Sequence, residues 1–312
     1  MLWLFLAPLL LGCVSSSTPT ALADAVDDFA TPPFYHIRGE GGASLLLMGT
    51  VHLGPPEGWR FSPRLLDALT SANRLVLEID PREATEDAVG TLLAKLAVTR
   101  PGVTLTDLVS PETAKLLDEN EATLESLGMP RNASRWKKPW YVALWLLETA
   151  VVESDFTPAA SADSLIFETL GGRQLIGLES FDEQLAIFDS LSPRLQDVML
   201  RGALLGLDTA VEEIHSLVDA WRHGDERLLE EITSKGIKEL PEFEELHDAM
   251  LRDRNHRWLG EFRSLLDDRE YLDETIFVGV GALHLVGDDG LVRLLRAAGY
   301  TVEPIDPQAG KR

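Results

Sequence analysis

A Gly-x-x-His motif occurs twice in this chain, as Gly49-Thr50-Val51-His52 near its start and as Gly281-Ala282-Leu283-His284 near its end. Each copy follows an apolar run that is typical of a buried strand. A glycine at the end of a strand permits a tight backbone turn, and the histidine three residues later then projects from the mouth of the sheet. Imidazole is a common ligand of transition metals, so the two histidines predict halves of one site.

Two glutamates end other apolar runs in a similar way. Glu78 lies at the end of the run 74–79, and Glu179 directly follows Gly177-Leu178. In open α/β sheets, ligands bind beyond the carboxyl ends of the strands, so these carboxylates are expected near the histidines. Histidine and glutamate together suit a divalent ion such as Zn, Mn, Fe or Co. The predicted metal ligands are His52, Glu78 and His284, supported by Gly49 and Gly281.

The same residues predict a hydrolytic reaction. A bound metal lowers the pKa of water and polarises a carbonyl, and a second glutamate can take the proton of the water. Arg254, beside Asn255 on a predicted helix 250–266, can stabilise the negative charge that develops. The predicted catalytic residues are Glu78, Glu179 and Arg254, with Asn255 as support. Taken singly, each has a structural alternative: a histidine in a loop, a glutamate that caps a helix, or an arginine on a solvated helix face.

Strands that are distant in sequence must position these side chains. Apolar runs predict strands at 34–38, 44–50, 74–79, 173–178, 275–280 and 300–304. A helix at 62–73 joins the second and third strands as a βαβ unit, which makes them parallel. Further helices are predicted at 83–98, 111–127, 139–153, 161–170, from 181, and at 290–298. We therefore predict an α/β fold with a small, largely parallel sheet built from both chain ends, and helical insertions at about 82–171 and 193–267.

The composition excludes several classes of protein. The formal net charge is −23, which argues against a nucleic-acid partner. The sequence contains no P-loop, dinucleotide fingerprint, Gly-x-Ser-x-Gly elbow or His-Glu-x-x-His motif. The single cysteine, Cys13, has no second cysteine with which to form a disulfide within the chain.

The N-terminus predicts export. Residues 1–12 are almost wholly apolar and fit a signal peptide, and Leu10-Leu11-Gly12-Cys13 resembles the lipobox of bacterial lipoproteins. We therefore expect a lipidated Cys13, a polar tether over 13–32 and a folded domain over 33–312. The expected location is the cell envelope, on the periplasmic face of the outer membrane, with the lipid anchor in the membrane. A secretory signal cleaved elsewhere is the alternative.

These motifs together resemble the TraB/GumN family, which is related to the Tiki proteases and more distantly to erythromycin-esterase-like (EreA) and ChaN-like proteins. The resemblance extends from about Tyr35 to Pro304 and includes both Gly-x-x-His motifs. Its other matching segments are Leu77-Glu78, Lys138-Pro139-Trp140, Ser161-Ala162-Asp163, Gly177-Leu178-Glu179-Ser180 with Gln184, and Arg254-Asn255.

The resemblance implies an EreA/ChaN-like fold and a metal-dependent hydrolase, peptidase-like, that acts on a peptide or small-molecule substrate. His52, Glu78 and His284 match the motif positions of the family, and Glu179 and Arg254-Asn255 match supporting positions. The alternative function is a non-enzymatic envelope lipoprotein that binds haem, iron or a peptide in the same crevice.

Overall fold

A six-stranded sheet forms the centre of the protein, whose computed structural model describes residues 29–308. The strands are β1 (Phe34–Arg38), β2 (Ser44–Thr50), β3 (Arg74–Leu77), β4 (Gln174–Gly177), β5 (Thr275–Gly281) and β6 (Thr301–Pro304). Their order across the sheet is β4-β3-β5-β2-β1-β6. The four strands from β4 to β2 are parallel, β1 forms an antiparallel hairpin with β2, and β6 pairs antiparallel with β1. The predicted largely parallel sheet is thereby confirmed.

The register of the sheet brings the two chain ends together. β2 and β5 are direct neighbours, with Thr50 opposite Gly281 and Gly49 opposite Val280. β3 lies on the other side of β5, with Leu77 opposite Gly279. The two Gly-x-x-His motifs and Glu78 therefore leave the sheet on three adjacent strands at the same edge.

Fourteen α-helices are assigned within residues 29–308. They are α1 (Pro63–Ser71), α2 (Glu86–Leu96), α3 (Pro111–Glu119), α4 (Glu121–Ser126), α5 (Arg131–Ser134), α6 (Pro139–Glu153), α7 (Ala162–Glu168), α8 (Phe181–Ser190), α9 (Pro193–Leu205), α10 (Ala210–Arg222), α11 (Glu226–Glu239), α12 (Phe243–His247), α13 (Asp253–Asp267) and α14 (Leu291–Ala297). Ser62 caps α1 and Pro63 occupies its first turn, which fixes the start of the helix predicted at 62–73.

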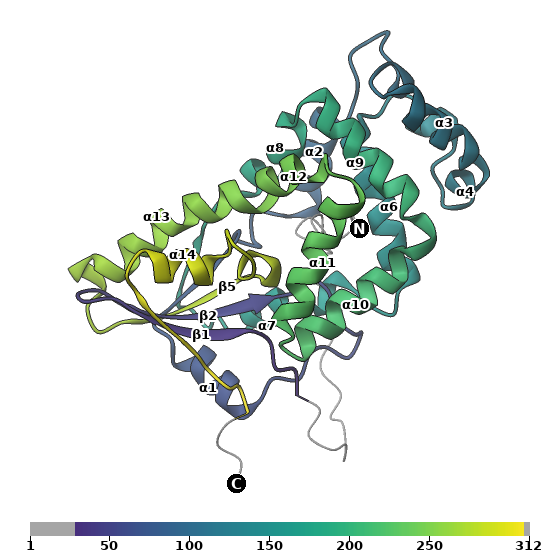
Figure 1. Cartoon of the computed structure of the whole chain (residues 1–312). Coiled ribbons are helices and arrows are strands. Elements are labelled where there is room, and N and C mark those ends of the chain that lie inside the picture. The colour runs from purple at the N-terminus through teal and green to yellow at the C-terminus, as the bar shows by residue number, and fades with distance from the viewer. Residues whose placement is uncertain (1–28, 309–312) are drawn as a thin grey trace.

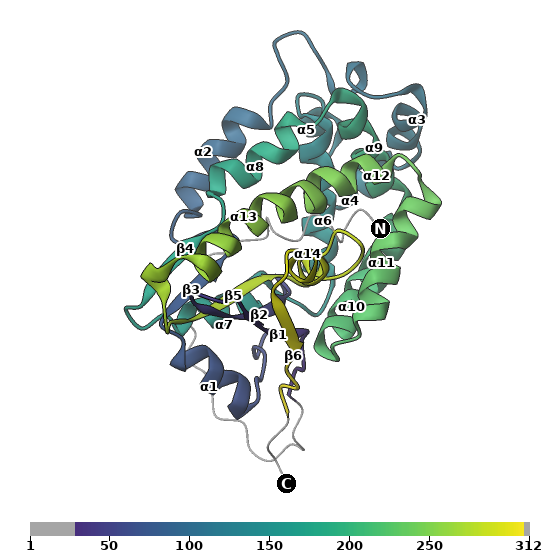
Figure 2. The ribbon, with the colours of Figure 1, turned by 60° about the vertical axis from the view of Figure 1, so that its left-hand side comes forward.

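Helices cover both faces of the sheet (Figures 1 and 2). On one face, Trp258 and Phe262 of α13 and Leu291 of α14 pack against alternate strand residues such as Leu47 and Val278. On the other face lie α1 and α7, whose apolar residues belong to a larger core that continues into the helical insertions. This α/β/α layering encloses the strands, so their runs are apolar on both faces.

The helical insertions form a lobe beyond the carboxyl edge of the sheet. The buried helix α6 packs against α9 and α10 at its centre, while α3 and α4 lie at the end farthest from the strands (Figure 1). Trp221 of α10 connects the lobe to the sheet, because its indole Nε1 donates a hydrogen bond of 2.7 Å to the carbonyl oxygen of Gly49.

The structure differs from the sequence prediction in three places. The helix predicted at 111–127 is two helices, because Asn120 ends α3 and its side-chain amide donates to the carbonyl of Leu116. A π-helical turn, Asp248–Arg252, precedes α13 within the second predicted insertion. The packed chain also begins before residue 33, since Ala30 is buried and bridges to Phe61.

The predicted signal peptide, Cys13 and most of the tether lie outside the described residues. Within residues 29–308, no helix is both long enough and apolar enough to cross a membrane.

Candidate functional site

The structure brings the six polar residues of the predicted site together at the carboxyl edge of the sheet. His52 lies in the loop after β2, Glu78 directly follows β3, and Glu179 follows β4. His284 ends a short 3₁₀ helix, Ala282–His284, after β5. Arg254 and Asn255 project from the first turn of α13 and are buried beside these side chains.

The two motif glycines have a role different from the one the sequence predicts. Neither has a positive φ; Gly281 has φ −49° and ψ 135°, which other residues can adopt. Both glycines instead allow neighbouring atoms to approach the backbone closely. A Cβ on Gly281 would lie 3.1 Å from Glu78 Oε1, and one on Gly49 would lie 3.1 Å from Ala282 Cα. The glycines thus allow the carboxylate and the second motif to pack against the ends of the strands.

Glu78 is the centre of the site. Its Oε1 accepts a 2.7 Å hydrogen bond from the backbone N–H of Gly281 and lies 3.9 Å from His52 Nε2 and 3.8 Å from His284 Nε2. Burial raises the pKa of this carboxyl, but Arg254 and the two histidines outweigh that effect and lower it to about 2. Glu78 is therefore a carboxylate that faces both imidazoles.

Asn255 fixes the tautomer of His284. The side-chain amide of Asn255 donates to the carbonyls of His284 and Asp289, so its Oδ1 accepts from His284 Nδ1 at 2.6 Å. Burial and the neighbouring Arg254 guanidinium lower the pKa of His284 to about 3. The ring is therefore neutral, and its Nε2 carries the lone pair.

Asp163, at the start of α7, orients His52. Its Oδ2 lies 2.9 Å from His52 Nδ1, and its Oδ1 accepts from the Thr50 hydroxyl at 2.9 Å. Burial lowers the pKa of His52, but the Asp163 carboxylate outweighs burial and raises it to about 9. Among the described residues, the buried Nε2 of His52 has no hydrogen-bond partner.

Arg254 uses all five of its N–H groups within the protein. Its Nη2 donates to Glu78 at 2.6 Å and to Glu179 at 2.5 Å, and its Nε donates to Glu179 at 3.3 Å. Its Nη1 donates to the carbonyl of Met250 and to His284 Nε2, both at 3.1 Å. The sequence prediction had Arg254 stabilise a developing charge, but in this arrangement Arg254 has no donor left for a substrate.

Glu179 connects this cluster to the surface. Its Oε1 accepts from Gln184 at 3.0 Å, and its Oε2 receives a longer contact of 3.4 Å from Arg257, whose side chain is 57% exposed. Burial raises the pKa of Glu179, although Arg254 opposes the rise. Arg257 thus retains donors that face solvent beside this carboxylate.

Comparison with known proteins assigns the chain to a family. The model of the TraB/PrgY/gumN family matches residues 33–304, which is most of the chain. The chain belongs to the TraB/PrgY/gumN family. The matched residues cover nearly all of the described structure, residues 29–308.

Curated relatives of this TraB/PrgY/gumN chain have no assigned activity. An uncharacterized protein of Treponema pallidum is 24% identical over 198 residues, which are 63% of this chain and 58% of that protein. The uncharacterized protein YbaP of Escherichia coli is 24% identical over 278 residues, or 85% of this chain and 93% of YbaP. The chain thus spans less than two thirds of the Treponema protein but nearly all of YbaP. No solved structure matches the chain significantly.

As arranged, residues 29–308 contain no group of three or more His, Cys, Asp or Glu side chains that could hold a metal ion. Glu78 and His284 instead contact a cationic side chain, the guanidinium of Arg254. The donor types nevertheless suit a metal, because two bonds of about 2.1 Å can span the 3.8–3.9 Å between Glu78 Oε1 and either Nε2. A metal would require Arg254 Nη1 to leave His284 Nε2, and it would require His52 to lose the proton that Asp163 holds on its ring.

The sequence interpretation did not assign three residues that the structure adds to the site. Asp163 and Gln184 were quoted only as part of the family resemblance, yet they contact His52 and both glutamates. Trp258 was not noted, although its ring packs against the His284 ring at 4.5 Å and under the Arg254 guanidinium at 4.6 Å. The spacing of Trp258 four residues after Arg254 places both on one helix face and could have indicated this contact.

Replacement of Asp163 with asparagine is expected to lower the pKa of His52 from about 9 toward its ordinary value of about 6.5. The carboxylate is the main group that holds the proton on this buried ring, and an amide of the same shape removes only its charge. The pKa can be measured by following the His52 ring resonances in an NMR pH titration. Thr50→Val is the matched control, because it leaves the Asp163 carboxylate charged and should keep the high pKa. A His52 pKa near 9 in Asp163→Asn would contradict this assignment.

Proposed function

We propose that this protein is a metal-dependent hydrolase of an amide or ester bond, with its site at the carboxyl edge of the sheet. The observation that carries the proposal is the buried Nε2 of His52, which has no partner among the described residues and faces Glu78 Oε1. His284 faces the same oxygen, and the Nδ1 of each histidine is held by a side-chain oxygen. Histidines oriented through Nδ1 in this way are typical of metal ligands.

In this proposal His52 Nε2, Glu78 Oε1 and His284 Nε2 hold a divalent transition metal such as Mn, Co, Zn or Fe. Such an ion supplies an acidified water and polarises the scissile carbonyl. Asp163 and Asn255 keep the two rings in orientation, and the 2% exposure of Glu78 and of His284 keeps bulk water away.

Glu179 and Arg257 supply proton transfer and charge stabilisation. Glu179 Oε2 has only long contacts of 3.3 and 3.4 Å, and burial raises its pKa, both of which suit a group that accepts a proton. The side chain of Arg257 is 57% exposed, so it has donors that can reach a developing oxyanion. Arg254 instead acts as a fixed positive charge that keeps Glu78 ionised.

A cavity beside the loop that carries His52 can receive part of a substrate. It has a volume of about 420 Å³ and is lined by the apolar Pro55, Trp59 and Phe156 together with polar and charged residues, among them Glu57, Arg60 and residues of α10. The indole of Trp59 donates to the carbonyl of Leu53, the residue after His52. This lining supports a peptide or small-molecule substrate that carries both apolar and polar groups.

The proposed setting is the bacterial cell envelope. The apolar segment 1–12, followed by Cys13, supports attachment through a lipid on the periplasmic face of the outer membrane. The duplicated Gly-x-x-His motif supports a relationship to the Tiki, erythromycin-esterase-like and ChaN-like proteins, and hence the hydrolytic class.

The His52→Ala and His284→Ala variants test this function. Each removes one of the proposed nitrogen ligands, so each is expected to lose both stoichiometric metal, measured by elemental analysis, and hydrolysis of a peptide library. His36→Ala is the control, since His36 lies on β1, lines neither the site nor the cavity, and its substitution should leave both properties unchanged. Retention of metal by both site variants would rule out the proposed ligand set. Metal loss without any hydrolysis by the parent protein would favour the alternative, a non-enzymatic binding protein.

A further inference from the structure

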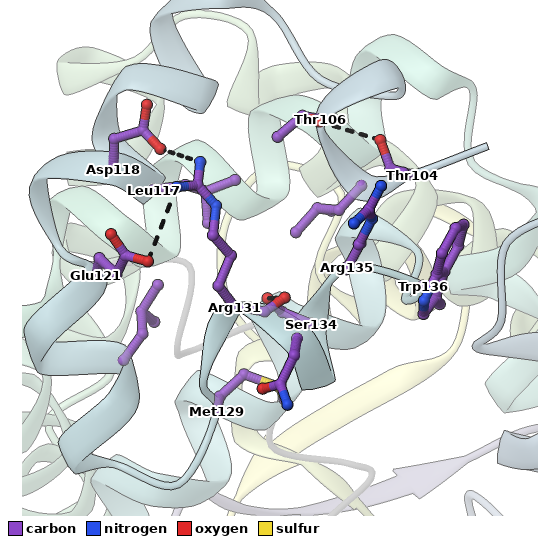
Figure 3. Close-up of a pocket in the computed structure, with 13 residues that line it drawn as sticks. Thr104, Thr106, Leu117, Asp118, Glu121, Met129, Arg131, Ser134, Arg135 and Trp136 are labelled. Atoms are coloured by element: carbon purple, nitrogen blue, oxygen red, sulfur yellow. Dashed lines mark hydrogen bonds and ion pairs between the residues drawn. The ribbon is translucent and has the colours of Figure 1, made fainter. Parts of the chain in front are cut away.

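A second cavity lies in the helical lobe, away from the sheet (Figure 3). Its volume is about 510 Å³, and its lining comes entirely from residues 104–136, within the insertion between β3 and β4. Its floor is apolar and consists of the buried side chains of Leu105, Leu117, Leu124 and Met129. None of the six residues of the sheet-edge site lines it. A volume of this size suits a small molecule or a short peptide.

One wall of this lobe cavity carries an excess of negative charge. Arg131 forms an ion pair with Asp118 and lies 3.8 Å from Glu121, so one guanidinium serves two carboxylates. All three side chains are about half exposed and therefore accessible to a ligand. In Figure 3, Arg131 points toward the two acids on one side of the cavity.

The opposite wall carries a positive charge that no carboxylate of the described residues neutralises by an ion pair. The guanidinium of Arg135 lies 5.0 Å above the ring of Trp136, whose exposed fraction is 43%. Arg135 contributes to lowering the pKa of Asp107, but the Asp107 carboxylate accepts its hydrogen bonds from the backbone N–H and hydroxyl of Thr104. In a chain with a formal net charge of −23, such an arginine marks a local site for an anionic group.

We propose that the lobe cavity binds a zwitterionic ligand with an apolar body, of the class of short free peptides. The ligand ammonium lies at Asp118 and Glu121, its carboxylate lies at Arg135, and its apolar side chains cover the leucine and methionine floor. A ligand that is only anionic is disfavoured, because the two acids and the negative charge of the chain repel it. This inference is independent of the metal-dependent activity.

Calorimetric titration of the purified full-length protein with the tripeptide Leu-Leu-Leu tests the proposal. The titration is done in EDTA, so that metal-dependent cleavage does not consume the peptide. Saturable binding is expected for the free peptide, with clearly weaker binding of its N-acetylated form, of its C-amidated form and of Gly-Gly-Gly. The indole N–H resonance of Trp136 should shift with the same saturation.

Variants assign the binding to the two walls of the cavity. Arg135→Met and Asp118→Asn are each expected to weaken the affinity about tenfold, the size of one charge-assisted hydrogen bond. Lys137→Met is the matched control, because Lys137 stacks on Tyr141 at 4.8 Å and does not line the cavity. Equal binding of the capped peptides, unchanged affinity in Arg135→Met, or no saturable binding at all would overturn the proposal.

Discussion

Replacement of Arg254 with methionine is expected to lower the free energy of unfolding by about 3–5 kcal/mol at pH 7, the usual cost of removing one partner from a buried ion pair. Arg254 is only 1% exposed and is the only cation paired with Glu78 among the described side chains apart from the two histidines. Without Arg254, Glu78 and Glu179 stay buried but lose the positive charge that compensates for the desolvation of their carboxylates. Urea denaturation followed by circular dichroism measures the change.

Three further variants identify the cause of this loss. Arg254→Met with Glu179→Gln should recover part of the stability, because one of the two uncompensated charges is then absent. Arg254→Lys should not recover it, since an ammonium cannot reproduce the five N–H contacts of the guanidinium. Arg38→Met removes an exposed pair with Glu303 and should change stability by less than about 1 kcal/mol. A similar change in Arg254→Met and Arg38→Met would contradict the central role of the buried cluster.

The strands and their common edge were predictable because their signals are local. Each strand of the sheet reads as an apolar run, and a parallel sheet places the carboxyl ends of such runs together. This reasoning was enough to expect His52, Glu78, Glu179 and His284 on one edge. It did not require knowledge of the strand order, in which β5 is inserted between β2 and β3.

The electrostatic arrangement of the site was not predictable, because it depends on contacts between distant elements. The sequence placed Arg254 on a predicted helix, 250–266, as a residue of the site, but it did not indicate that Arg254 is buried in ion pairs with Glu78 and Glu179. A π-helical turn just before α13 contributes the Met250 carbonyl that Arg254 binds, and no period in the sequence indicates such a turn. Likewise, Asp163 reaches His52 only through the packing of α7 against the sheet edge.

The free energy of unfolding is expected to fall both below and above about pH 6.5. Folding lowers the pKa of one histidine of the site, His284, and raises the pKa of the other, His52. His284 has a folded pKa of about 3, below its unfolded value, so the unfolded chain binds more protons from pH 6.5 down to 3. Its contribution is complete above pH 6.5 and is lost by about 1.4 kcal/mol per unit as the pH falls. His52 has a folded pKa of about 9, so its contribution is complete below pH 6.5 and is lost as the pH rises to 9.

Urea denaturation between pH 5 and pH 9 measures both slopes, and one variant removes each. His284→Gln should flatten the acid side, and His52→Gln should flatten the alkaline side, whatever either variant does to the stability at pH 6.5. His36→Gln is the control: burial lowers the pKa of this histidine too, so it accounts for part of the acid slope but none of the alkaline slope. His247, whose pKa burial also lowers, accounts together with His36 for the acid slope that remains in His284→Gln. If His52→Gln leaves the alkaline slope unchanged, the slope does not come from loss of a proton by His52 between pH 6.5 and 9. The Asp163 carboxylate would then not hold a proton on this ring.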